Sequence, residues 1–89
     1  MSLARYEIES DLVCTMSTAS GNELALVLTL SHRPDGSWWY IDVLPGNGLG
    51  EFSPWPIDQI PTGLPQQRRP DEQTLQEIAA GWARSHGCG

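Results

Sequence analysis

The chain has 89 residues, a formal net charge of −6 at pH 7 and no lysine, so arginine supplies all five of its basic side chains. Clustered Lys and Arg are needed to neutralise nucleic-acid phosphates, so this balance argues against direct nucleic-acid binding. No apolar run reaches the roughly 18 residues of a membrane span, and the N-terminus lacks a secretory-signal pattern. We therefore expect a single small domain over residues 1–89 that is cytoplasmic and does not bind membranes.

The first predicted element is a strand over Arg5–Met16, because apolar and acidic residues alternate along it. A break at Ser10 suits a bulge or an edge position. The acidic side is typical of a solvated strand edge; the alternative is an electrostatic docking surface for a basic partner. The apolar side holds Tyr6, Ile8, Leu12, Cys14 and Met16, and the acidic side holds Glu7, Glu9 and Asp11.

The clearest pattern is a pair of apolar runs within Leu24–Leu44, joined by residues 34–36 (Pro-Asp-Gly). Two such runs around a short Pro/Asp/Gly connection predict a β-hairpin. The first run, Glu23–His32, follows a turn over Ser17–Asn22. Its odd-numbered and even-numbered residues are both apolar, so both of its faces are apolar, which is typical of a central strand.

The second run, Ser37–Leu44, has two faces of different character. Trp39, Ile41 and Val43 share the parity that suits the core. An aromatic pair beside a carboxylate occupies the other face, and Trp and Tyr are enriched in binding hot spots. The alternative is that the next segment folds over this face and closes a second, minor core. The three residues of this face are Trp38, Tyr40 and Asp42.

Residues 45–70 are rich in proline and glycine, and their apolar residues show no period. We interpret this segment as a long connection, with a short edge strand at Glu51–Ser53 as an option. Its apolar residues, Trp55 among them, indicate that the connection is held against the domain.

The sequence of residues 70–87 predicts a C-terminal helix. Pro70 suits the first turn, and Asp71 and Glu72 oppose the positive end of the helix dipole. Gly81 weakens the helix relative to alanine, and we interpret it as a point of close approach to the sheet. Apolar side chains at three- and four-residue spacing should pack on the sheet. They are Leu75, Ile78, Ala79 and Trp82.

Together these elements predict an α+β fold: a three- to four-stranded antiparallel β-meander, a long Pro/Gly-rich connection, and one C-terminal α-helix packed on the sheet.

No reaction centre or metal site has a recognisable spacing. A cysteine nucleophile would need Cys14 beside His32 or His86 and an oriented third group. Cys14 shares the apolar parity of its strand, which favours a buried structural thiol. A disulfide between Cys14 and Cys88 is left open. We expect no catalytic residue, no metal and no cofactor.

Leu44–Gly50 (LPGNGLG) is glycine-rich, but we interpret it as a turn and not as a phosphate cradle. A cradle needs a helix to begin directly after the glycines, and the next residues, GEFSPWP, do not open one. The segment also resembles a short segment, LPGSGLG, in one family of small phage proteins that inhibit type I CRISPR surveillance complexes. This resemblance covers Leu44–Gly50 alone and implies no functional residue.

We therefore expect a small acidic, non-enzymatic module that binds a protein partner through an aromatic and acidic sheet face. Two alternatives stay open: an inhibitor of the phage or mobile-element type whose acids mimic nucleic-acid phosphates, and a small cysteine-dependent hydrolase. Pairing of two copies through an exposed strand edge is a further option. The expected binding residues are Trp38, Tyr40, Asp42, Trp55, Glu7, Glu9 and Asp11.

Overall fold

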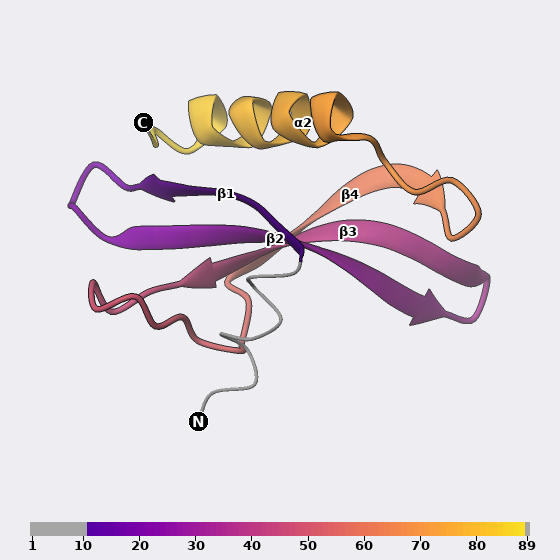
Figure 1. Ribbon diagram of the computed structural model, residues 1–89, viewed down its shortest axis with the longest axis horizontal. Coiled ribbons are helices and arrows are strands. Elements are labelled where there is room, and N and C mark those ends of the chain that lie inside the picture. The colour runs from indigo at the N-terminus through magenta and orange to yellow at the C-terminus, as the bar shows by residue number, and fades with distance from the viewer. Residues whose placement is uncertain (1–10, 89) are drawn as a thin grey trace.

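The structure, a computed structural model, describes residues 11–88. Its strands follow one another in space as in the chain, in the order β1-β2-β3-β4, and all neighbours are antiparallel. The sheet is strongly twisted and carries one helix on one face (Figure 1). The predicted α+β meander with a C-terminal helix is confirmed. The elements are β1 (Leu12–Ser17), β2 (Glu23–Arg33), β3 (Gly36–Pro45), β4 (Asp58–Pro65) and α2 (Glu72–Ser85).

The main core lies between the sheet and α2. Leu26, Ile41 and Val43 are fully buried there, at 0% exposure, and Leu24 and Ala79 complete the buried set. The predicted inward parity of β3 is thus confirmed for Ile41 and Val43. Burying one such side chain is worth about 1.5–3 kcal/mol, so this layer supplies much of the stability of a small domain.

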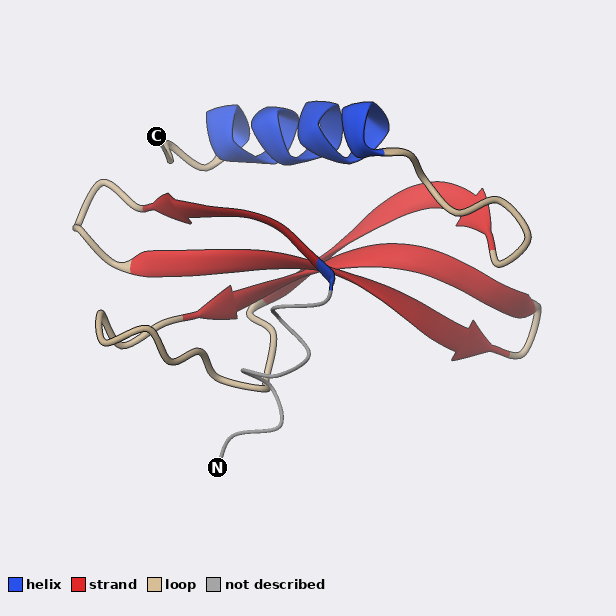
Figure 2. Ribbon diagram, viewed as in Figure 1, coloured by secondary structure: helices blue, strands red, loops and turns tan. Residues whose placement is uncertain are grey.

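A second, smaller core lies on the opposite face of the sheet. Ala25, Val27 and Leu44 are buried there, and Phe52 from the segment after β3 packs against them. Figure 2 shows this segment leaving β3 and running on the side of the sheet away from α2. Because β2 is covered on both faces, it is the central strand that its two-sided apolar pattern predicts.

The predicted first strand is shorter and its parity changes. The register between β1 and β2 shifts between Leu12 and Cys14, which is the mark of a β-bulge. The extra residue, Val13, therefore packs against the main core, and Leu12 is 42% exposed. The bulge was expected at Ser10, which lies outside the described residues, as does the rest of the predicted strand before Asp11.

The prediction of one loop over residues 45–70 is wrong for its second half, because β4 occupies Asp58–Pro65. This strand was not predicted because it contains two prolines and a glycine, which are rare within strands. Pro61 pairs with Tyr40 and Pro65 with Trp38. The residues of β3 that direct their backbone groups toward β4 are the odd-numbered ones, such as Trp39. The Trp39 carbonyl accepts a hydrogen bond from the Thr62 hydroxyl at 2.8 Å. The proline nitrogens therefore face away from β3, where no ladder hydrogen bond is lost.

Gly63 adopts a φ of 77°, which favours glycine. It lies where the β3–β4 register shifts. At Glu51–Ser53, the optional edge strand is reduced to a single bridge between Gly46 and Phe52.

The helix begins slightly later than predicted. Asp71 is its N-cap and accepts a hydrogen bond from the Thr74 amide at 2.8 Å, so Pro70 lies before the first turn. Trp82 donates from Nε1 to Asp58 at 2.8 Å, which ties α2 to the start of β4. Among residues 11–88, no helix has the length and apolar character needed to cross a membrane.

Candidate functional site

The predicted aromatic face of β3 exists, and it lies on the side of the sheet away from α2. Trp38, Tyr40 and Asp42 alternate with the buried Ile41 and Val43, and all three are half-buried. We call these three residues the β3 face. The structure brings them together on one strand, as the parity predicted.

Two members of the β3 face are held by neighbours. The Arg33 guanidinium carbon lies 4.6 Å from the centroid of the Tyr40 ring, a cation–π distance. Asp42 accepts a hydrogen bond from the Gln59 amide at 3.0 Å. Trp38 Nε1 is buried and has no hydrogen-bond partner among residues 11–88. Gln59 could not be placed from the sequence, because β4 was not predicted.

Trp55 lies elsewhere, on the segment that follows β3. Residues 46–57, here called the anchored loop, are fixed to the sheet at both ends. The Gly46 amide donates to Glu23 at 2.8 Å, the Ser53 amide to Pro45 at 2.9 Å, and the Ile57 amide to Val43 at 2.9 Å. Trp55 is thus bracketed by bonds to Val43 and Pro45. Val43 is five residues beyond Trp38, or about 16 Å along the strand, so Trp55 does not adjoin Trp38.

Large apolar side chains project from the anchored loop. Leu49 is 80% exposed, Trp55 77% and Ile57 61%. The loop also holds its own shape, because Asn47 accepts from the Leu49 amide at 2.8 Å and donates to Glu51 at 3.1 Å. These side chains are therefore presented on an ordered backbone.

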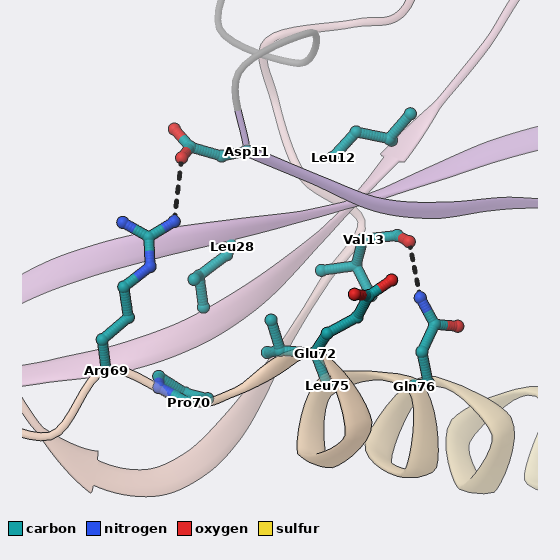
Figure 3. Close-up of a pocket in the computed structure, with 9 residues that line it drawn as sticks. All are labelled: Asp11, Leu12, Val13, Leu28, Arg69, Pro70, Glu72, Leu75 and Gln76. Carbon is teal, nitrogen blue, oxygen red and sulfur yellow. Dashed lines mark hydrogen bonds and ion pairs between the residues drawn. The ribbon is translucent and has the colours of Figure 1, made fainter.

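Asp11 belongs to a different region, on the α2 side of the sheet. Its carboxylate lies 3.5 Å from the Arg69 guanidinium, at the mouth of a groove (Figure 3). Leu28 and Leu75 line this groove, and Gln76 closes it by donating to the Val13 carbonyl at 2.9 Å. Asp11 therefore does not share a surface with the β3 face. Glu7 and Glu9, its expected partners, lie outside the described residues.

Arg69 was missed by sequence reasoning. Its guanidinium carbon is also 5.4 Å from the centroid of the Trp39 ring, so it bridges Asp11 and β3. Asp11 and Arg69 are 58 positions apart, and no local pattern connects them. Only the tertiary arrangement reveals the pair.

Among residues 11–88, no hydrogen bond joins a cysteine thiol to a histidine ring. Cys14 packs against the main core, and burial raises the pKa of its thiol, which lowers the thiolate fraction. His32 lies 2.7 Å from the Ser37 hydroxyl, and His86 stacks on Trp82 with ring centroids 4.1 Å apart. Cys88, next to the C-terminus, also packs on the main core, and both cysteines are free. Within residues 11–88 no group of three His, Cys, Asp or Glu residues is placed to hold a metal ion.

Comparisons with protein-family models, with curated proteins and with solved structures found no match for this chain.

Proposed function

We propose that this chain is a non-catalytic protein-interaction module that inserts Trp55 into an apolar pocket of a folded partner with a basic rim. The observation that carries this proposal is the 77% exposure of Trp55 on a loop held by backbone hydrogen bonds on both sides of it. Trp is the residue most typical of interface hot spots. A loop that is already ordered loses little conformational entropy when it binds.

The exposed indole is large enough to anchor a complex. A Trp side chain buries up to about 250 Å². At 77% exposure roughly 190 Å² remains to be covered, which corresponds to about 4–5 kcal/mol at 25 cal/mol per Å². Ile57 and Leu49 add apolar area beside it. This gross gain is offset in part by the loss of translational and rotational freedom on association.

The charge around the loop indicates the chemistry of the partner. From Pro45 to Gln67 the sequence contains acidic residues but neither Lys nor Arg. Glu51 and Asp58 are both exposed there. Arg33 is instead the last residue of β2, and Arg68 and Arg69 lie in the connection between β4 and α2. A pocket rimmed by Lys or Arg would therefore complement the anchored loop and be attracted to it at long range.

The β3 face extends this surface on the same side of the sheet. Asp42 is next to Val43, to which the Ile57 amide bonds, so the carboxylate lies between the loop and the aromatic pair. We assign Trp38 and Tyr40 to the margin of the contact, because both are half-buried, and Trp55 to its centre.

The test compares Trp55→Ala with Leu12→Ala, which truncates another exposed apolar residue, on β1 and away from the anchored loop. Proteins captured from a source-cell lysate by the wild type are identified by mass spectrometry, purified, and titrated against each variant by calorimetry. We expect Trp55→Ala to weaken binding about thirtyfold or more, as at a hot spot, and Leu12→Ala to change it little.

The free energy of unfolding should stay within about 0.5 kcal/mol of wild type in Trp55→Ala, because an exposed side chain is removed. A partner that binds Trp55→Ala as tightly as wild type would contradict the assignment. Capture that is lost equally in both variants would contradict it as well.

A further inference from the structure

We propose that Asn47 is a site of covalent self-modification, at which the folded chain loses the side-chain amide and the residue becomes aspartate or isoaspartate. Asn47 precedes Gly48 in the anchored loop, and both residues are exposed. In this reaction, deamidation, the backbone nitrogen of the next residue attacks the asparagine side chain. Glycine in that next position has no Cβ to hinder the attack, so the sequence of the loop favours the reaction here.

The attacking nitrogen, that of Gly48, is not held by the fold. The backbone amides on either side of it are bonded. The Asn47 amide donates to the Glu51 carbonyl at 3.1 Å, and the Leu49 amide donates to the Asn47 side chain at 2.8 Å. Among residues 11–88, by contrast, the Gly48 amide donates no hydrogen bond. Because Gly48 is also exposed, water has access to this amide and its proton.

The Asn47 carboxamide is held over the peptide group that attacks it. Its Oδ1 accepts from the Leu49 amide at 2.8 Å, which closes a ring around the Gly48 peptide group, an Asx turn. Attack of the Gly48 nitrogen on Cγ puts negative charge on Oδ1, and the Leu49 amide is already bonded to that atom. A donor fixed at the atom where charge develops stabilises the transition state.

The only co-reactant of this chemistry is water. The Gly48 nitrogen gives its proton to hydroxide and forms a bond to Cγ of Asn47. The bond from Cγ to Nδ2 then breaks, Nδ2 takes a proton from water, and ammonia leaves behind a cyclic succinimide. Addition of water at Cγ opens the ring to aspartate, and addition at the main-chain carbonyl carbon opens it to isoaspartate. Overall, water is consumed and ammonia released, with no change in oxidation state.

Either product alters the anchored loop. Asn47 donates from Nδ2 to Oε1 of Glu51 at 3.1 Å, and aspartate replaces that donor by a second carboxylate, which repels the first. Isoaspartate also lengthens the main chain by a methylene group. The turn from Asn47 to Glu51 therefore loosens, on the same loop that presents Trp55. The chemistry itself does not depend on the contact proposed for Trp55, since it is measured by mass with no partner present.

The first test incubates the folded full chain at mildly alkaline pH and follows each asparagine by mass spectrometry. Asn22 is the internal control, because it is the other asparagine of the chain and is exposed, but Glu23 follows it. Cleavage after Glu23 and Glu51 separates the two sites. We expect Asn47 to convert at least about tenfold faster than Asn22, a small difference in activation free energy, and isoaspartyl methyltransferase to label the product. Equal rates, or conversion of Asn47 in the urea-unfolded chain alone, overturn the proposal.

The second test concerns the donor to Oδ1. Leu49→Pro removes this amide, and Leu49→Ala keeps it and is the matched control. Leu49 is 80% exposed, so neither change removes core packing, and urea unfolding checks that both variants fold. We expect Leu49→Pro to convert roughly five- to tenfold more slowly than Leu49→Ala, the effect of one hydrogen bond in the transition state. Equal rates would show that the Leu49 amide takes no part and would overturn the proposed geometry.

The third test measures the effect of the product on the loop. Asn47→Asp reproduces the aspartate product, and the backbone amide of residue 47, which bonds to the Glu51 carbonyl, reports on the turn. We expect this amide to exchange with solvent faster in Asn47→Asp than in wild type. Unchanged exchange would show that the turn tolerates a second carboxylate and would overturn the proposed loosening.

Discussion

Replacement of Gly46 by alanine should release the anchored loop. Gly46 is the first residue after β3, and a Cβ at this position would lie 2.7 Å from Cε1 and 2.9 Å from Cδ1 of Phe52, and 3.4 Å from Cβ of Glu23. Carbon atoms in ordinary contact are about 3.5–4.0 Å apart. The Phe52 ring must therefore move by about 1 Å or leave its place against Ala25 and Leu44.

The loss of stability is set by whichever response of the Phe52 ring costs less: a shift within its site or departure from it. Forcing an extra carbon into a packed site costs about 1–3 kcal/mol. Exposing Phe52 completely would forfeit at most the 1.5–3 kcal/mol of a fully buried ring, and this ring is only half-buried. We therefore expect Gly46→Ala to lower the free energy of unfolding by about 1–2 kcal/mol, or the midpoint of thermal unfolding by roughly 4–16 °C in a domain of this size.

Urea unfolding of Gly46→Ala, Phe52→Ala and the double variant forms a double-mutant cycle. With the ring absent, the alanine at position 46 has room. It should then be neutral or stabilising by up to about 1 kcal/mol, because it restricts the unfolded chain. If Gly46→Ala costs the same with and without Phe52, the contact between these residues does not hold the loop, and the account of its anchoring is wrong.

Two further predictions concern α2. Gly81→Ala should stabilise the protein by about 1 kcal/mol in urea unfolding, because among residues 11–88 the atom nearest to a Cβ there is a terminal nitrogen of Arg84 at 3.9 Å, an ordinary contact. Destabilisation would mean that the helix lies closer to the sheet than it does here. The hydrogen bond from Thr74 lowers the pKa of the Asp71 carboxyl. The stability that this cap contributes is therefore complete at pH values above the ordinary carboxyl pKa. It is lost as the pH falls through the lowered pKa of the folded state. Asp71→Asn keeps the acceptor but does not titrate, and its urea midpoint should fall less than that of wild type between about pH 5 and pH 2; equal falls would count against the cap.

The sequence predicts the centre of the fold well, because the residues there obey one strong period. Glu23–Arg33 and Gly36–Pro45 alternate as strands in contact with a core must, and Leu75 and Ile78 repeat at helical spacing. Where a single residue interrupts the period, the prediction fails. Val13 is the extra residue of a bulge, and it turns Leu12 outward although both have the apolar character of a core residue.

β4 was missed for a related reason. Pro61, Gly63 and Pro65 would weaken a central strand, and a sequence pattern does not show that their nitrogens face outward on an edge. Similarly, Gly81 was interpreted as a close contact, whereas the space beside it is open.

The candidate site is predicted only in part. The parity of β3 is enough to group Trp38, Tyr40 and Asp42, since alternation is a local property of the strand. Trp55 was identified by residue type, but its exposure depends on where the loop bonds to β3. The neighbours of Asp11 come from the segment before α2, and no local pattern could have joined them.

The prolines of β4 have a consequence for how far this sheet can grow. On that flank Pro61 and Pro65 remove two outward amides, and the bulge at Gly63 interrupts the run, so an incoming strand finds no regular set of donors. The β4 flank is therefore protected against edge-to-edge pairing with another sheet. A chain with these two prolines replaced would present outward amides at both positions and so a template on which another strand could pair.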